Sequence, residues 1–283
     1  MIKLFTIDMD GTLLDSNGSV DESTKQALQK LNNAGVKTVL CSGRMVKSIE
    51  HFNDILEIDN PLIGNNGSII KINKDEIIYA NPLEDEDLQE LISFCHQHKF
   101  KYHFYDEDTF YSNRLNSKGI KHLMKDTDYG LNLQCNLSIS NNPFEMLKAR
   151  NRSAYKILIG NLTEHPYDLN EITRMFVEKF GHKLYVTSSG IGNLEIMKKG
   201  VSKWNGAIHL ADFLGINKDE IAAIGDSHND LPMIEAAKLS FAMGNANETV
   251  KSTANYAVSD NDNGGIAEAS QIILDYNKEN PSV

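Results

Sequence analysis

The sequence predicts an α/β protein: a core built on a parallel β-sheet, with an inserted α+β domain. Its 283 residues exceed the length of one average domain. Both ends of the chain alternate apolar, strand-like runs with amphipathic, helix-like segments, which favours a parallel sheet wrapped by helices. The middle of the chain loses this alternation. We therefore expect one discontinuous core, at residues 1–82 and 191–283, and a second domain at 83–190.

The expected core elements follow from the spacing of apolar residues. Before the insertion they are strands at 3–8 and 37–41, helices at 23–33 and 45–56, a short strand that ends at 64, and a hairpin over 68–80. After it they are helices at 207–214, 231–238, 246–253 and 265–276, and strands at 221–224, 239–242 and 256–258. Strands that alternate with helices in this way are typical of βαβ units.

The insertion mixes short strands with two long helices. An acidic segment at 84–87 starts a helix that reaches 98, and a second helix is expected over 169–180. Strands are expected at 102–105, 109–112, 155–160 and 183–187. This order is that of an α+β domain.

Composition excludes several classes of function. The hydrophobic fraction of 41% and the charged fraction of 24% are ordinary for a globular protein. A net charge of −11 disfavours nucleic acid or an anionic membrane as the partner. There is no 18-residue apolar run and no signal peptide pattern, so we expect a cytoplasmic protein. Cys41, Cys95 and Cys135 form no metal or disulfide pattern and are expected to be reduced. The sequence does not indicate the oligomeric state.

Two aspartates, Asp8 and Asp10, end the first apolar run and are followed directly by Gly11-Thr12. Because the strand ends just after Asp8, both carboxylates can point into one crevice beyond its carboxyl end. Ligands bind in that crevice in open α/β sheets. Close carboxylates repel each other and need a cation or a shared proton. An acidic surface turn is the alternative, since Asp and Gly are common in turns.

Polar loops also follow the next two strands. Ser42-Gly43-Arg44 offers a hydroxyl and backbone N–H groups that would suit a phosphoryl oxygen. A serine that caps the next helix is an equally good interpretation. Asn65-Asn66-Gly67 offers amide donors, although Asn-Gly more commonly marks a hairpin turn.

A lysine and a third carboxylate come from the second half of the core. Lys203 precedes a helix, where a positive charge opposes the helix dipole and suggests a nearby anion. Most lysines are only solvated, as we expect for Lys198 and Lys199. The segment Gly225-Asp226-Ser227-His228-Asn229-Asp230 again follows a strand and adds Asp226 to the same sheet edge. Such oxygen ligands suit Mg²⁺ better than zinc, and with the lysine they predict a phosphate site.

Taken in order, these four stretches resemble the four motifs of the haloacid dehalogenase superfamily, and specifically of its Cof-like phosphatases. The resemblance covers nearly the whole core, including Met243-Gly244-Asn245-Ala246 and Asp262-Asn263-Gly264-Gly265. It implies a Rossmann-like core with a large α+β cap of type IIB inserted between the second and third motifs. Trp204 departs from the family, which usually has a small residue there; we expect it to pack in the core, or alternatively at the pocket mouth.

The resemblance also implies a role for each motif residue. Asp8 would be the nucleophile that forms an aspartyl-phosphate, and Asp10 the general acid and base. Mg²⁺ would be bound by the Asp8 carboxylate, the Asp10 backbone carbonyl and Asp226, with Asp230 orienting a ligand or bound water. The residues expected to bind or position the phosphoryl group are Ser42, Gly43, Arg44, Asn66, Asn229, Thr12 and the catalytic Lys203.

The expected function is a Mg²⁺-dependent phosphatase for small phosphorylated metabolites. Sugar phosphates are the first expectation and cofactor phosphates the second. A phosphomutase that uses the same aspartyl-phosphate chemistry is one alternative. A non-catalytic regulator that binds metal and phosphate is another, although both the nucleophile and the acid are present.

Overall fold

A computed structural model describes residues 1–114, 124–127, 130–133, 135–160, 162, 165–188 and 192–281. The chain divides into two compact units, which are described separately. The first unit comprises Met1–Gly43, Phe52–Tyr79 and Ser202–Val283, and the second comprises Arg44–His51 and Ala80–Val201. The α/β class predicted from the sequence is confirmed.

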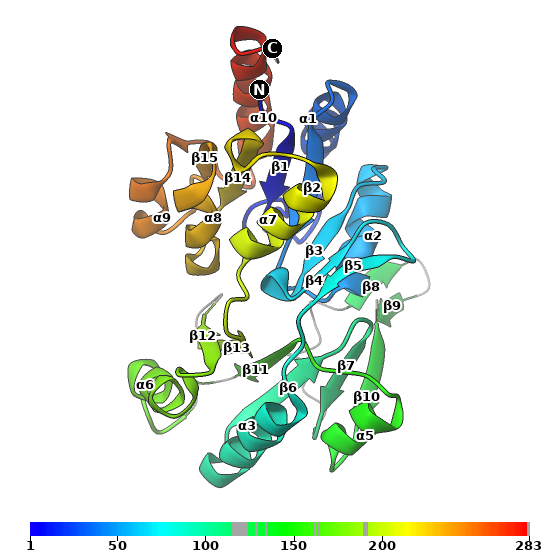
Figure 1. The fold of residues 1–283 in the computed structure, drawn as a ribbon, viewed down its shortest axis with the longest axis vertical. Coiled ribbons are helices and arrows are strands. Elements are labelled where there is room, and N and C mark those ends of the chain that lie inside the picture. The colour runs from blue at the N-terminus through cyan, green and yellow to red at the C-terminus, as the bar shows by residue number, and fades with distance from the viewer. Residues whose placement is uncertain are drawn as a thin grey trace. The chain divides into compact units, whose positions relative to one another are not determined.

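The first unit is built on an eight-stranded sheet with the order β16-β15-β14-β1-β2-β3-β4-β5 (Figure 1). The strands are β1 (Leu4–Ile7), β2 (Lys37–Cys41), β3 (Leu62–Gly64), β4 (Ile69–Lys71), β5 (Ile77–Ala80), β14 (Ile221–Gly225), β15 (Leu239–Ala242) and β16 (Tyr256–Ala257). From β16 to β3 every neighbouring pair is parallel, and β4 pairs antiparallel with β3. The carboxyl ends of β14, β1, β2 and β3 therefore meet at one edge.

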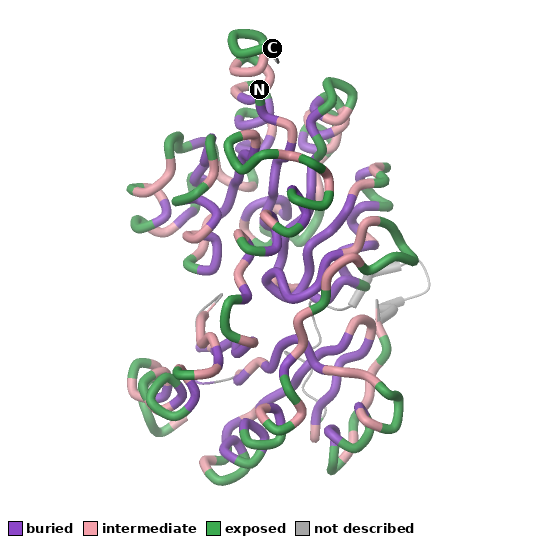
Figure 2. The backbone as a smooth tube through the Cα atoms, in the orientation of Figure 1, coloured by how far each residue is buried: buried purple, intermediate pink, exposed green. Residues whose placement is uncertain are grey.

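Burial explains why these short runs form the centre of the sheet. Every residue of β1 and β14 is buried, as Figure 2 shows for the inner strands. Strands covered on both faces read as continuous apolar runs, which is the pattern of these segments. Leu4 pairs with Ile221 on one side and Lys37 on the other, so the sheet joins the two ends of the chain.

Helices flank this sheet, and capping residues set where they begin. They are α1 (Glu22–Asn33), α7 (Lys203–Leu214), α8 (Leu231–Ala236), α9 (Glu248–Thr253) and α10 (Gly265–Glu279), with short 3₁₀ turns η1 (Asn65–Gly67), η4 (Lys218–Glu220) and η5 (His228–Asp230). Helix α2 (Val46–Leu56) is divided between the units, because residues up to His51 belong to the second and those from Phe52 to the first. The Ser202 hydroxyl accepts a hydrogen bond from the Asn205 N–H and so starts α7 at Lys203. Trp204 packs, partly buried, against the apolar cluster between α7 and the sheet, which agrees with the expected core role.

The second unit contains a six-stranded sheet with the order β10-β7-β6-β11-β13-β12 and a separate β8–β9 hairpin. Its strands are β6 (Lys101–Tyr105), β7 (Thr109–Ser112), β8 (Met124–Thr127), β9 (Gly130–Leu133), β10 (Asn136–Ile139), β11 (Lys156–Gly160), β12 (Leu184–Thr187) and β13 (Leu194–Lys198), and its helices are α3 (Asp85–His98), α5 (Pro143–Ala149) and α6 (Leu169–Phe180). Side chains from α3, α6 and one face of the sheet form an apolar core, in which the ring of Phe94 packs edge to face with those of Phe176 and Phe180.

Several elements of this unit were not predicted from the sequence. Helix α5 and strands β8, β9, β10 and β13 were not among the expected elements. Strand β13 pairs antiparallel with β11 and β12, so residues 194–198 belong to this sheet and not to the expected core segment 191–283. The expected boundary at 190/191 falls outside the described residues. A five-residue strand directly before Gly200 and the Lys203 motif carries no local signal of which sheet it joins.

Within the described ranges, no helix combines the length and the apolar composition that crossing a lipid bilayer would require.

Candidate active site

A buried lysine joins two carboxylates at the carboxyl edge of the eight-stranded sheet. Nζ of Lys203 lies 2.5 Å from Oδ1 of Asp8 and 2.6 Å from Oδ1 of Asp230. The exposed fraction is 1% for Lys203, 4% for Asp8 and 0% for Asp230. Asp8 directly follows β1, Asp230 ends η5 after β14, and Lys203 is the first residue of α7. Three segments that are far apart in the sequence thus meet at one point.

Asp230 also shapes the loop that carries Asp226. Its Oδ2 accepts hydrogen bonds from the backbone N–H groups of Asp226, at 3.1 Å, and Ser227, at 2.9 Å. A Cβ on Gly225 would lie 2.5 Å from Cβ of Asp230, so only glycine allows this close approach. Asp230 therefore links Lys203 to the turn that positions Asp226.

The side chain of Asp226 is held on both oxygens. Thr12 Oγ1 donates to Oδ1 at 3.2 Å, and Ser227 Oγ donates to Oδ2 at 3.0 Å. The backbone carbonyl of Asp226 accepts from both the backbone N–H and the side-chain amide of Asn247. Gly11, at φ +82°, passes so close that a Cβ there would lie 2.8 Å from Oδ2 of Asp226. The loops after β1 and β14 are thus packed together around one carboxylate.

Burial and mutual repulsion dominate the electrostatics of this cluster. Burial, with repulsion from Asp230 and Asp226, raises the pKa of Asp8 well above its ordinary value despite the nearby Lys203. Burial and repulsion from Asp230 likewise raise the pKa of Asp226. Burial alone would lower the pKa of Lys203, but attraction to Asp230 and Asp8 outweighs it and raises that pKa. The lysine is therefore protonated, and the carboxyl groups of Asp8 and Asp226 resist ionisation.

The three carboxylates fit a divalent cation. One oxygen each from Asp8, Asp226 and Asp230 lies within 4.8 Å of the others. Lys203 supplies one positive charge to three carboxylates, which leaves an excess of two negative charges when all are ionised. Hard oxygen donors are the ligands that Mg²⁺ and Ca²⁺ prefer. A bound divalent cation would offset the charge excess that raises these pKa values.

The predicted loops after β2 and β3 are adjacent to this cluster. The backbone N–H of Asn66 donates to the Ser42 carbonyl at 2.9 Å. Oδ1 of Asn66 accepts a hydrogen bond from Nδ2 of Asn229 at 3.2 Å. Ser42, Asn66 and Asn229 are all buried, and Gly43 is half-buried. The Asn66-Gly67 sequence also lies in the turn that links the antiparallel strands β3 and β4. This segment is therefore both a hairpin turn and a polar loop next to the cluster.

Asp10 differs in its exposure from the buried carboxylates of the site. Asp10 is exposed on the loop after β1, where its backbone bridges to Leu14. Its carboxylate is not among the described carboxylates that converge on one point. Arg44 belongs to the second unit.

Three residues of the site had no expected role. Ser227 and Asn247 hold Asp226, and Asn245 donates from Nδ2 to the Gly11 carbonyl at 2.8 Å. Asn245 does lie in the Met243–Ala246 stretch that resembles the family. Ser227 lies inside the fourth motif, so its position could have suggested its role.

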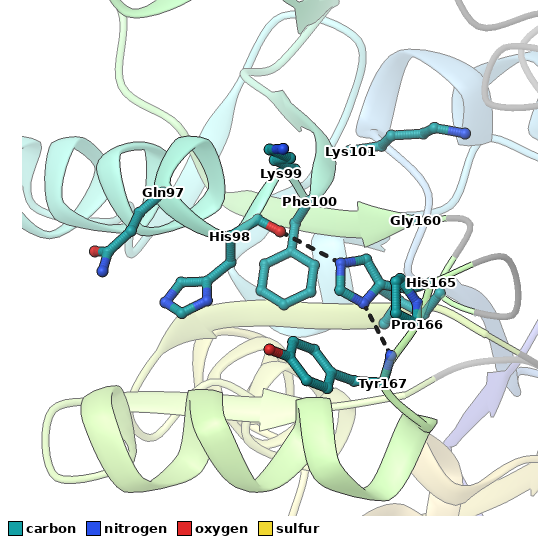
Figure 3. A pocket seen from close by; sticks show the side chains of 10 residues that line it. Gln97, His98, Lys99, Phe100, Lys101, Gly160, His165, Pro166 and Tyr167 are labelled. Atoms are coloured by element: carbon teal, nitrogen blue, oxygen red, sulfur yellow. Dashed lines mark hydrogen bonds between the residues drawn. The ribbon is translucent and has the colours of Figure 1, made fainter.

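The second unit contains a separate pocket of about 520 Å³ (Figure 3). Its wall carries the rings of His98, Phe100, His165 and Tyr167. The His165 ring accepts a hydrogen bond from the Tyr167 N–H at Nδ1, and its Nε2 lies 3.3 Å from the His98 carbonyl oxygen, so two contacts hold the ring in the wall. The described lining residues include no carboxylate. This pocket therefore lacks the acidic chemistry of the Asp8 cluster.

Comparison with known proteins identifies the family. The sequence pattern of the haloacid dehalogenase-like hydrolases matches residues 5–269. The phosphatase YwpJ of Bacillus subtilis is 29% identical over 292 residues, which cover 96% of this chain and 100% of that protein. The 5-amino-6-(5-phospho-D-ribitylamino)uracil phosphatase YcsE of Bacillus subtilis is 26% identical, covering 95% of this chain and 94% of its own.

A solved structure agrees with the sequence relatives. The crystal structure of a haloacid dehalogenase-like hydrolase from Bacteroides thetaiotaomicron has a TM-score of 0.82 at 27% identity. The alignment covers 96% of this chain and 100% of that chain. The chain therefore belongs to the haloacid dehalogenase-like hydrolases, as its four motifs predicted.

Proposed function

We propose that this protein is a Mg²⁺-dependent phosphatase that hydrolyses small phosphorylated metabolites through an aspartyl-phosphate. The enzyme class, a phosphoric monoester hydrolase, is confirmed by the family and by its phosphatase relatives. The observation that best supports the mechanism is the contact of Lys203 with Asp8 and Asp230 at the carboxyl edge of the sheet. A buried ammonium group beside a carboxylate can bind an anion that the carboxylate alone would repel.

Asp8 is the proposed nucleophile. An oxygen of its carboxylate attacks phosphorus, a new O–P bond forms, and the bond from phosphorus to the leaving alkoxide breaks. Asp10 gives its proton to that alkoxide and afterwards takes a proton from the water that releases phosphate. The exposed position of Asp10 suits an acid that must exchange its proton, in contrast to the buried Asp8.

Asp8, the Asp10 carbonyl and Asp226 would hold the metal, and Asp230 would orient a ligand or bound water. A divalent metal is general in phosphatases of this superfamily, and Mg²⁺ is our choice among such ions because oxygen donors and a phosphate ligand suit it. When bound, it would keep Asp8 ionised and offset charge on the phosphoryl group.

The remaining predicted residues would bind the transferring phosphoryl group. Ser42, Gly43 and Asn229 offer a hydroxyl, backbone N–H groups and an amide close to the cluster, and Lys203 offers the main positive charge. Fixed donors of this kind stabilise the charge spread over three oxygens in the transition state. We retain Arg44 in this set as a proposal, and we assign Thr12 to the support of Asp226.

The substrate class is proposed from chemistry and relatives. The name of YcsE gives its substrate as 5-amino-6-(5-phospho-D-ribitylamino)uracil, a ribityl phosphate attached to a pyrimidine ring. Sugar phosphates and cofactor-related phosphates therefore remain the first compounds to test. We further propose that the second unit acts as a cap that selects the leaving group.

A direct test measures phosphate release from p-nitrophenyl phosphate with purified protein, with and without Mg²⁺. We expect turnover that requires the metal and is abolished in Asp8→Asn. Turnover that persists in Asp8→Asn would exclude the covalent mechanism. A panel of sugar and cofactor phosphates, assayed for free phosphate and for transferred phosphate, would then separate a phosphatase from a phosphomutase.

A further inference from the structure

The turn Asn65–Gly67 contacts three separate segments of the site. The N–H of Asn66 donates to the carbonyl of Ser42, and its Oδ1 accepts from Nδ2 of Asn229. The same turn also packs against the start of α7, which Lys203 begins. One residue, Asn66, therefore touches the loops after β2 and β14 with two different polar groups.

Backbone dihedral angles and close packing both restrict the conformation of this turn. Asn65, Asn66 and Gly67 have φ values of 48°, 56° and 97°, all in the left-handed region. A Cβ on Gly67 would lie 2.2 Å from the carbonyl oxygen of Ser202, and one on Gly206 would lie 2.9 Å from Cα of Gly67. Two glycines thus let the turn and the helix meet backbone to backbone. Such close packing leaves the Asn66 side chain little freedom.

Asn229 depends on Asn66 for its orientation. Its exposed fraction is only 7%, and among the described residues its buried Oδ1 has no hydrogen-bond partner. The bond from Nδ2 to Asn66 therefore fixes the plane of the amide. An amide has two N–H donors, so the second one remains to serve a phosphoryl oxygen in the fixed plane.

We infer that Asn66 is a positioning residue, which acts on the bound phosphoryl group through Asn229 and makes no contact with it. This inference rests on the proposed function, since it assumes a phosphate site at Asn229. It also revises the expectation that Asn66 itself binds phosphate. The oxygen that Asn66 presents to Asn229 is an acceptor, so this atom orients the amide of Asn229 and does not donate to phosphate. Direct donation from Nδ2 of Asn66 to phosphate would appear as a further loss of binding when Asn66→Gly is added to Asn229→Ala.

A double-mutant cycle tests this inference. The dissociation constant of inorganic phosphate is measured by calorimetry, in the presence of Mg²⁺, for wild type, Asn66→Gly, Asn229→Ala and the double variant. Glycine keeps the positive φ at position 66 and removes only the side chain. We expect each single change to weaken binding, by about fivefold for Asn66→Gly and about tenfold for Asn229→Ala. In the double variant, Asn66→Gly should add no further loss.

Two further variants exclude a merely structural effect. Asn65→Gly alters the adjacent buried residue of the same turn, whose side-chain amide makes no hydrogen bond to any described residue, and should change phosphate binding by less than about twofold. Asn66→Asp tolerates the left-handed conformation and keeps an acceptor for Asn229. In that background, Asn229→Ala should again weaken phosphate binding. This pair of variants provides the test if Asn66→Gly fails to fold.

The inference would be overturned if Asn66→Gly weakened phosphate binding equally in the wild-type and Asn229→Ala backgrounds. It would also be overturned if Asn65→Gly weakened phosphate binding as much as Asn66→Gly does. Failure of the proposed function would look different. In that case the wild-type protein itself would neither bind inorganic phosphate nor release it from p-nitrophenyl phosphate.

Discussion

Nζ of Lys203 lies 2.5 Å from Oδ1 of Asp8, and both side chains are almost completely buried. Burying a charge is costly unless it is paired, so this contact must be well compensated. The compensation comes from Asp230, which shares the same ammonium group and is itself held by two backbone N–H groups. The arrangement keeps a positive charge next to a nucleophile that will meet an anionic substrate.

The first prediction concerns the charge of Lys203. Lys203→Met keeps most of the side-chain volume and removes the ammonium group. We expect kcat/KM for p-nitrophenyl phosphate to fall by about 10²- to 10³-fold, because the main fixed positive charge at the phosphoryl group is lost. The free energy of unfolding of the metal-free protein should also fall, by about 3–5 kcal/mol, since two buried carboxylates lose their partner.

Lys199→Met is the matched control for this variant. Lys199 lies four residues earlier and is exposed, with Nζ near the carbonyl of His182. Kinetic constants and denaturant midpoint should stay close to wild type in this variant. If Lys203→Met behaved like Lys199→Met, Lys203 would have no catalytic role.

The second prediction uses the raised pKa values of Asp8 and Asp226. A carboxyl whose pKa is raised by folding contributes stability below its ordinary pKa, and this contribution is lost as the pH rises through the folded pKa. The ordinary value for Asp8 is 3.8. In metal-free protein, wild type should therefore lose stability relative to Asp8→Asn between about pH 4 and pH 8.

Thermal unfolding at several pH values measures this difference. At pH 8 without metal, Asp8→Asn should unfold at a temperature higher by at least about 2 °C, and the gap should close toward pH 4. Carboxyls with lowered pKa values, such as Asp262 and Asp275, titrate in both proteins and cancel in the comparison. Saturating Mg²⁺ should stabilise wild type more than Asp8→Asn. A gap that widened as the pH fell would contradict the assigned direction.

The sequence predicted the core of this fold better than it predicted the second unit. Strands β1 and β14 are almost wholly apolar, β2 ends in the apolar run Val39–Cys41, and the three are followed directly by Asp8, Asp226 and Ser42, respectively, so pattern and motif agree there. By contrast, β13 is five residues long and pairs with β11, which precedes it by more than thirty residues. A strand this short carries no residue pattern that identifies so distant a pairing partner.

The motifs also identified the residues of the Asp8 cluster, but they did not predict which of these residues contact each other. Polar residues at the ends of four strands predicted a shared crevice. The sharing of Lys203 between Asp8 and Asp230 depends on where α7 begins, which the Ser202 cap sets. The contact between Asn66 and Asn229 depends on three consecutive positive φ values, which Asn and Gly permit but do not require.

The third prediction concerns the support of Asp226 by Thr12. Thr12→Val keeps the shape of the side chain and removes the hydroxyl that donates to Oδ1 of Asp226 at 3.2 Å. We expect the Mg²⁺ concentration for half-maximal activity to rise about three- to tenfold, because a carboxylate that has lost a hydrogen bond holds the metal less well. The kcat at saturating Mg²⁺ should change little. A lower kcat with unchanged Mg²⁺ dependence would point to a different role for Thr12.

The fourth prediction separates backbone strain from contact at Gly11. Gly11 and Gly18 have nearly equal φ values of +82° and +79°, so alanine meets a similar backbone penalty at both positions. A Cβ at position 11 would lie 2.8 Å from Oδ2 of Asp226, whereas one at position 18 would meet nothing within 4 Å. Gly11→Ala should therefore displace the Asp226 carboxylate, and Gly18→Ala should not.

The measurement is the Mg²⁺ dependence of turnover beside the thermal unfolding temperature. Both variants should lose a similar amount of stability, of order 1 kcal/mol, from the left-handed backbone. Only Gly11→Ala should also need more Mg²⁺, by roughly tenfold or more, since a displaced carboxylate no longer meets its partners. Equal Mg²⁺ dependence in the two variants would mean that Asp226 can move aside without cost, and that it does not hold the metal.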